Sequence, residues 1–170
     1  MGDRLAHLQS VVDELGDRLV AVSSVYVTAP WGGVEQDDFY NAAFVADDAA
    51  LDEWGWLDLC HRLEERAERV RAVRWGPRSL DVDVIAVTSG PVPPGAATVG
   101  PGAAAAGAGP EVRSEHPDLL LPHPRAHERA FVLVPWGEID PEARLSGAAV
   151  ADLIAGLAPD EVAGVARTDL

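Results

Sequence analysis

Apolar residues recur every three to four positions in two long stretches, which predicts two amphipathic helices. The first covers residues 3–16, where Leu5, Leu8, Val11 and Leu15 mark the apolar face. Asp3 is its expected N-cap and Gly16 its end. The second predicted helix covers residues 51–69, and a shorter apolar stretch predicts a terminal helix at 148–157.

Four other stretches are β-branched, alternating or continuously apolar, and each predicts a strand. They cover residues 20–28, 39–46, 80–87 and 130–134. The predicted order is helix, strand, strand, helix, strand, strand, helix. This order indicates an antiparallel sheet with helices packed against it, an α+β sandwich. A length of 170 residues suits one domain spanning the whole chain, 1–170.

One segment, 89–110, interrupts this pattern with Gly, Pro and Ala and almost no anchoring side chain. Such a composition cannot bury enough apolar surface to offset the entropy of ordering. We therefore expect a mobile insertion there.

Charge narrows the choice of partners. The net charge is −15, which argues against nucleic acid or an anionic membrane as a partner. The chain has no lysine, and six of its 13 arginines fall within residues 62–78. This cluster indicates a compact anionic ligand. The alternative is a solvated helix face with arginines paired to neighbouring glutamates.

The remaining composition predicts a cytoplasmic protein, and we expect a monomer. Cys60 is the single cysteine, so it has no intrachain disulfide partner, and we expect it to pack in the core. No apolar run reaches the roughly 18 residues that would span a bilayer.

Two acidic residues, Asp81 and Asp83, stand two positions apart in the predicted strand 80–87. Alternate side chains of a strand share a face, so both carboxylates point one way while Leu80, Val82 and Val84 point the other. Paired carboxylates with phosphate oxygens suit Mg²⁺. With the arginines upstream, the pattern indicates phosphoryl transfer. An exposed strand face without a metal is the alternative.

Three separated motifs follow one another in an order that a known family shares. They are Ser23-Ser24-Val25-Tyr26-Val27-Thr28 with Asn41-Ala42-Ala43, Arg74-Trp75-Gly76-Pro77-Arg78 followed by Asp81-Val82-Asp83, and Pro122-His123-Pro124-Arg125 with Arg129-Ala130-Phe131. Through them the chain resembles 6-hydroxymethyl-7,8-dihydropterin pyrophosphokinase (2-amino-4-hydroxy-6-hydroxymethyldihydropteridine diphosphokinase) from residue 2 to about residue 141.

The resemblance implies a ferredoxin-like α+β core and Mg²⁺-dependent transfer of pyrophosphate from ATP to 6-hydroxymethyl-7,8-dihydropterin, releasing AMP, in folate biosynthesis. It implies that Asp81 and Asp83 hold two Mg²⁺ ions and that Arg69 and Arg78 act with them in catalysis. The residues that match the ATP site are Glu64, Arg69, Arg71, Arg74, Trp75, Arg78, Val84, His123 and Arg129. Glu64 also fits a solvated helix face, and no residue stands out as a general base.

For the pterin, the resemblance implies that Phe39 and Phe131 sandwich the ring while Thr28 and Asn41 read its polar edge. Asn41 suits an amide because it offers donors and an acceptor together. Two positions in one loop depart from the family pattern. Trp31 replaces an aliphatic residue, and Ala29 replaces a frequent proline. Trp31 is also expected to belong to the substrate site.

The start of the chain departs further. The family begins with an apolar strand ending in Gly-Ser-Asn-x-Gly-Asp, and Met1-Gly2-Asp3 matches only its last letters. The first strand is therefore expected to be missing from the sheet. Two alternatives remain open: a truncated or decayed nucleotide-binding module without turnover, and another Mg²⁺-dependent phosphoryl or nucleotidyl transferase.

Overall fold

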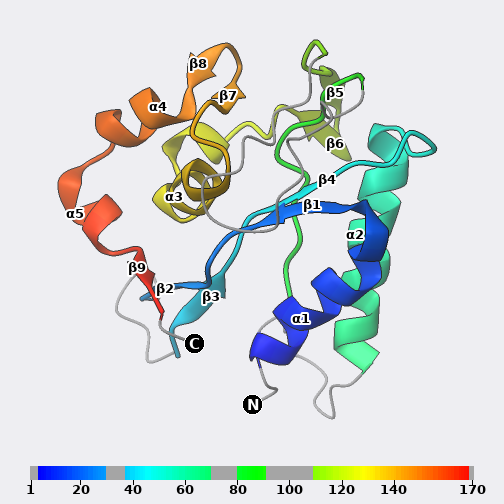
Figure 1. Ribbon diagram of the computed structural model, residues 1–170, viewed down its shortest axis with the longest axis horizontal. Coiled ribbons are helices and arrows are strands. Elements are labelled where there is room, and N and C mark those ends of the chain that lie inside the picture. Colours follow the sequence, from blue (N-terminus) through cyan, green and yellow to red (C-terminus); the bar gives the residue numbers. More distant parts are fainter. Residues whose placement is uncertain (1–3, 30–36, 70–79, 91–108, 169–170) are drawn as a thin grey trace.

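The computed structural model describes residues 4–29, 37–69, 80–90 and 109–168. Two helices lie together on one side of the molecule, α1 (Arg4–Leu15) and α2 (Glu53–Arg69) (Figure 1). Their apolar faces meet in a cluster of buried residues, to which Leu80 also belongs: Val11, Leu15, Leu59, Leu63, Ala67 and Leu80. Both helices were predicted from the same spacing. Asp3, the expected N-cap, lies outside the described residues.

Gly16 ends α1 with a φ of +50°, a conformation that glycine adopts without strain, and opens the 3-10 turn η1 (Gly16–Arg18). The chain then enters β1 (Leu19–Val22), which pairs antiparallel with β4 (Phe44–Ala46). Farther along, β2 (Tyr26–Thr28) pairs antiparallel with β3 (Phe39–Asn41) on one edge and β9 (Ala166–Arg167) on the other.

The prediction of continuous strands at 20–28 and 39–46 is therefore wrong, because each stretch divides into two strands of different sheets. The two breaks lie opposite each other. Ser23 donates its backbone N–H to the Ala43 carbonyl at 3.0 Å, and the Ala43 N–H is donated to Ser23 Oγ at 2.9 Å. The serine side chain thus replaces a ladder partner and interrupts both strands at one level.

The predicted strand at 130–134 is also wrong, since these residues begin helix α3 (Ala130–Ile139). A short apolar run carries no clear period, so it fits either element. Leu133 is buried in a cluster with Val150 of α4, and Ile139 is buried in a second cluster with Val20 and Ala21 of β1, so α3 is covered on more than one face, as a helix that is apolar all round requires. Pro135 lies inside the helix and is buried as well.

The third correction concerns residues 80–87, where the structure forms no strand. Nearby, Thr88 and Glu111 form an isolated antiparallel bridge, and Val112 donates its N–H to the Val87 carbonyl at 2.7 Å. The predicted alternation of side chains nevertheless holds. Asp81 and Asp83 are exposed, Leu80 is buried, and Val82 and Val84 are partly buried. Leu80 and Val82 pack into the cluster between α1 and α2, which favours this alternation without a sheet ladder.

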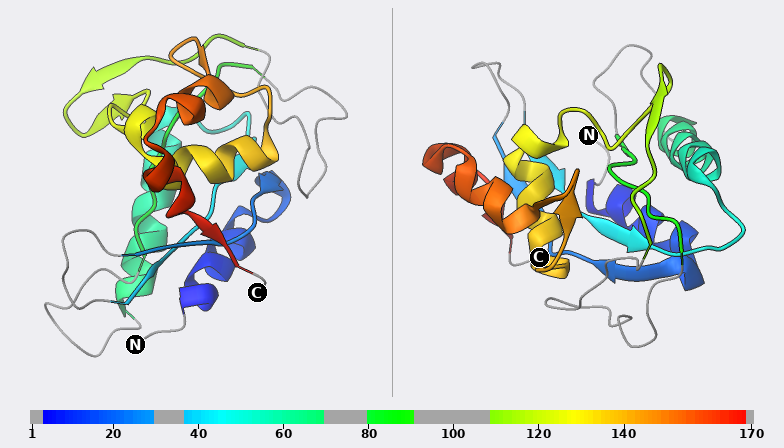
Figure 2. Two further views of the ribbon diagram at one scale, coloured as in Figure 1. Left: turned by 90° about the vertical axis from the view of Figure 1, so that its left-hand side faces the viewer. Right: turned by 90° about the horizontal axis from the view of Figure 1, so that it is seen from above.

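On the other side of the molecule, α3 packs against α4 (Val150–Gly156) (Figures 1 and 2). α4 lies within the helix predicted at 148–157. The elements that the sequence did not predict are short: β5 (Ser114–His116), β6 (Leu119–Leu121), η3 (Ala126–Glu128), β7 (Arg144–Leu145), β8 (Ala148–Ala149) and α5 (Pro159–Ala163).

Mixed helices and antiparallel strands in small open sheets confirm the α+β class. Of the expected insertion at 89–110, residues 91–108 lie outside the described part. Its described flanks meet, because Ser89 donates its N–H to the Pro110 carbonyl at 3.0 Å. Within the described residues, the helices are too short or too polar to cross a membrane.

Candidate active site

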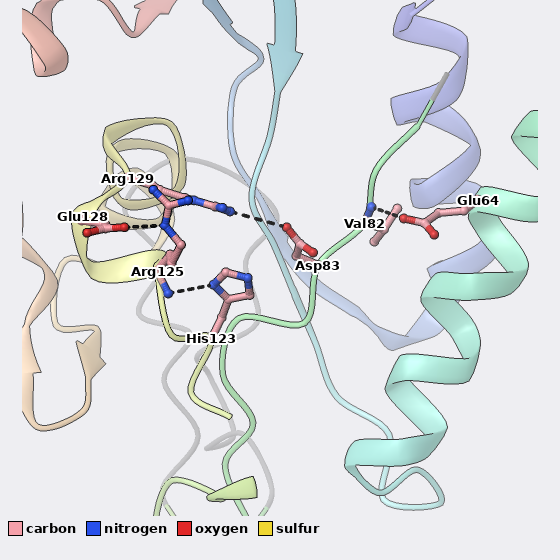
Figure 3. A network of polar contacts seen from close by, with 7 residues as sticks. All are labelled: Glu64, Val82, Asp83, His123, Arg125, Glu128 and Arg129. Atoms are coloured by element: carbon pink, nitrogen blue, oxygen red, sulfur yellow. Dashed lines mark hydrogen bonds and ion pairs between the residues drawn. The ribbon is translucent and has the colours of Figure 1, made fainter. Parts of the chain in front are cut away.

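The acidic segment is held from helix α2. Glu64 Oε1 accepts the backbone N–H of Val82 at 2.9 Å, at the position between Asp81 and Asp83 (Figure 3). Glu64 was expected in the nucleotide site, and its carboxylate bonds to the backbone between the two aspartates. The two aspartates are exposed on this tethered segment, so both side chains are accessible from solvent.

Cys60 lies buried on the same helix, one turn before Glu64. Burial, with the Glu64 and Asp83 carboxylates acting in the same direction, raises the pKa of its thiol to about 12. The thiol therefore stays protonated at neutral pH, which agrees with the packing role expected for it.

Arg129 faces the acidic segment from the opposite side. Its Nη1 lies 3.9 Å from Asp83 Oδ2, and Figure 3 shows the two side chains pointing toward each other. The guanidinium also lies 5.6 Å from the centre of the Phe131 ring. The Arg129 side chain is 25% exposed and that of Asp83 47% exposed, so the arginine is partly shielded while the carboxylate is open. Arg129 therefore connects the acidic pair with the aromatic side chain.

His123 lies in the same region. Its backbone N–H donates to the Ile85 carbonyl at 2.8 Å, which holds the turn that carries His123 against the acidic segment. Its Nδ1 accepts the Arg125 backbone N–H at 3.3 Å (Figure 3). An accepting Nδ1 carries no proton, so the neutral ring carries its proton on Nε2 and can donate it to an oxygen.

Arg125 and Glu128 flank this turn, and neither was predicted as a site residue. Arg125 Nε donates to Glu128 Oε1 at 2.5 Å, and this hydrogen bond lowers the pKa of Glu128. Both side chains are largely exposed. The Arg-x-x-Glu spacing was visible in the sequence, but it is common in solvated turns and helices.

The two residues predicted to read the polar edge of the pterin, Thr28 and Asn41, lie in contact with each other. Asn41 Nδ2 donates to Thr28 Oγ1 at 3.0 Å across the β2–β3 pair. Phe39, opposite Thr28 in the register, is 44% exposed and thus presents an aromatic surface to solvent. Phe131 lies in the first turn of α3, which packs against both strands. The elements that carry the four predicted pterin residues are therefore neighbours.

Trp31, Arg71, Arg74, Trp75 and Arg78 lie outside the described residues, as does the side chain of Arg69. Val84 is described and partly buried beside Asp83.

The acidic pair suits a hard cation only with help from a ligand. Throughout the described ranges, no three His, Cys, Asp or Glu side chains gather closely enough to hold a metal ion by themselves. Asp81 and Asp83 supply carboxylate oxygens, which Mg²⁺ accepts while substrate phosphates and waters complete its shell. The donor set therefore fits Mg²⁺ that arrives with a phosphorylated ligand.

The chain is similar to one known protein family over most of its length. A family model described as 7,8-dihydro-6-hydroxymethylpterin-pyrophosphokinase matches residues 1–141. Three relatives share the name 2-amino-4-hydroxy-6-hydroxymethyldihydropteridine pyrophosphokinase. The protein of Mycobacterium tuberculosis is 46% identical over 163 residues, 94% of this chain and 80% of its own. That of Mycobacterium leprae is 49% identical over 176 aligned positions, 100% of this chain and 85% of its own. That of Methylorubrum extorquens is 39% identical over 166 residues, which cover 95% of this chain and 90% of its own.

Proposed function

Because the chain belongs to the 7,8-dihydro-6-hydroxymethylpterin-pyrophosphokinase family, we propose that it transfers pyrophosphate from ATP to 6-hydroxymethyl-7,8-dihydropterin in folate biosynthesis. The observation that carries the proposal is the grouping of Asp83, Arg129 and Phe131. A carboxylate suited to a cation, a partly shielded guanidinium suited to phosphate and an aromatic ring suited to a pterin stand in consecutive contact.

In the proposed reaction, the hydroxymethyl oxygen of the pterin attacks the β-phosphorus of ATP. A bond forms between that oxygen and the β-phosphorus, the bond from the β-phosphorus to the α,β-bridging oxygen breaks, and AMP leaves with the bridging oxygen. The hydroxyl proton is released to solvent. Catalysis of such transfers is mostly alignment and charge stabilisation, which agrees with the lack of an evident general base.

Eight predicted site residues that the structure describes have a part in this alignment. Asp81 and Asp83 would hold Mg²⁺, which would neutralise charge on the triphosphate and polarise the attacking hydroxyl. Arg129 and the Nε2–H of His123 donate to phosphate oxygens. Thr28 and Asn41 read the polar edge of the pterin, and the rings of Phe39 and Phe131 stack on its faces.

The predicted site residues whose side chains lie outside the described part complete the proposal in the roles that the sequence predicted. Arg69, Arg71, Arg74 and Arg78 clamp the triphosphate, with Trp75 among them and Trp31 beside the pterin. Two bound Mg²⁺ ions, a monomeric state and a cytoplasmic location remain predictions.

A product assay tests the proposal directly. We expect the chain, mixed with ATP, Mg²⁺ and 6-hydroxymethyl-7,8-dihydropterin, to form AMP and the pterin pyrophosphate in equal amounts, detected by anion-exchange chromatography and ³¹P NMR. Omitting the pterin should abolish AMP formation. ADP with a pterin monophosphate would instead show another phosphoryl transferase. Binding of ATP without any product would show a nucleotide-binding module.

A further inference from the structure

Glu138, near the end of α3, is an almost buried acid outside the proposed site. Its side chain is 10% exposed, yet both oxygens are fully engaged. Oε1 accepts from Ser24 Oγ at 2.7 Å, and Oε2 accepts from the Ser24 backbone N–H at 2.8 Å and from Tyr26 Oη at 3.2 Å. Arg167 Nη1 of β9 lies 3.5 Å from Oε1. One carboxylate therefore connects α3 with the start of β2 and with β9.

The donors of Glu138 lie where the strands change partners. Ser24 belongs to the link between β1 and β2, and its N–H therefore bonds to the Glu138 carboxylate instead of a strand neighbour. Tyr26 begins β2, and burial together with the Glu138 carboxylate raises the pKa of its hydroxyl, so that it stays a donor. The direction in which β2 leaves the link is thus set by a residue of α3.

The same helix and the same strand carry the proposed pterin residues. Phe131 precedes Glu138 by seven residues, two helical turns, so both side chains leave α3 on about the same face, roughly 10 Å apart along the axis. Beyond the link, β2 carries Thr28, which bonds to Asn41 of β3. Any shift of β2 relative to α3 would therefore change the distance between the ring of Phe131 and the polar pair Thr28–Asn41.

We propose that Glu138 is a positioning residue of the pterin site, which fixes the β2–β3 pair against α3 at the spacing that a flat bicyclic ring requires. The inference rests on the proposed function. It assigns to Glu138 no contact with either substrate. Its effect should therefore appear in pterin binding and leave the binding of ATP near Asp83, Arg129 and His123 largely unchanged.

Glu138→Gln is the main test, because glutamine keeps the size of the side chain but places an NH₂ donor against other donors. With α,β-methylene-ATP present, fluorescence titration with 6-hydroxymethylpterin should show a loss of affinity of about tenfold, as expected when a charged hydrogen bond in a shielded site is removed. The Kd for α,β-methylene-ATP alone should stay near the wild-type value. Glu142→Gln, four residues later and exposed, is the matched control and should bind both ligands as the wild type does.

Two further measurements separate positioning from a purely structural role. Ser24→Ala removes only the hydroxyl donor and should weaken pterin binding in the same direction by a smaller factor. Hydrogen exchange at the amides of β2 and β3 should be faster in Glu138→Gln, while the amides of α1 and α2 keep their protection. Loss of thermal stability without a selective loss of pterin affinity would show a structural role only and overturn the inference.

The outcomes also distinguish this inference from the proposed function. A folded Glu138→Gln variant with wild-type pterin affinity, or with equal losses for pterin and nucleotide, overturns the role of Glu138 while the proposed function stands. A wild-type chain that neither binds the pterin nor forms AMP overturns both.

Discussion

At the scale of single residues, the acidic pair offers the sharpest prediction. Asp81→Ala or Asp83→Ala should abolish turnover, because each removes a carboxylate that we propose to hold Mg²⁺. Both side chains are exposed, so the free energy of unfolding should change by no more than about 0.5 kcal/mol. Initial rates across a Mg²⁺ series and urea unfolding curves measure the two effects separately.

The matched control for this pair is Asp118→Ala, because Asp118 is an acid at 79% exposure in the β5–β6 turn. It should leave both rate and stability unchanged. Near-normal turnover by either site variant would show that the cation is held elsewhere. A calorimetric titration with Mg²⁺ and α,β-methylene-ATP should then still show wild-type binding.

At the scale of elements, helix α2 holds the acidic segment through the hydrogen bond between Glu64 and the Val82 backbone. Residues 81–87 have no strand ladder, and the Glu64 carboxylate holds the Val82 N–H between the two aspartates. Glu64→Gln removes the charge of the acceptor in this hydrogen bond. A hydrogen bond to a charged group contributes about 1.5–3 kcal/mol to stability in a shielded site and less where water competes. We expect several-fold more Mg²⁺ to be needed for half-maximal rate, measured at saturating substrates.

Glu65→Gln is the control for this variant, since Glu65 follows directly on the same helix and is exposed. It should keep the wild-type Mg²⁺ dependence. If both variants shift that dependence equally, the cause is the lost negative charge near the cation, and the hydrogen bond to Val82 has no special role.

At the scale of the whole molecule, the two described flanks of the insertion, residues 88–89 and 110–111, are bonded to each other. Ser89 and Pro110 share a hydrogen bond, and Thr88 bridges Glu111. A Cβ at Gly109 would stand 1.2 Å from the Ser89 carbonyl oxygen, so this close approach requires glycine. Replacing residues 91–108 with a short Gly-Ser linker should therefore keep the melting temperature and activity, because loop closure costs only about 0.6 kcal/mol per doubling of length.

The control is Gly109→Ala in the otherwise unchanged chain, which should separate the two flanks and lower the melting temperature. Differential scanning calorimetry and the AMP assay measure both variants. A linker variant that melts normally but loses activity would show that residues 91–108 contribute to the reaction itself.

The sequence by itself determined what depends on local pattern. Helices α1 and α2 follow from apolar spacing, because a helix of that length must bury its apolar stripe wherever it packs. The outward direction of Asp81 and Asp83 follows from the alternation with Leu80, Val82 and Val84, and it persists without the predicted strand. The motifs that indicated the family are local as well, and the match to the family model confirms the family that they indicated.

Only the tertiary structure decided the features that depend on distant partners. The apolar run at 130–134 suits a strand or a helix equally, and burial against α4 and η3 selects the helix α3. The strands around Ser23 and Ala43 break because a side chain 20 positions away replaces a ladder bond. Glu138 accepts from Ser24 across 114 positions, and a carboxylate whose donors are so remote leaves no periodic or local signal in the sequence.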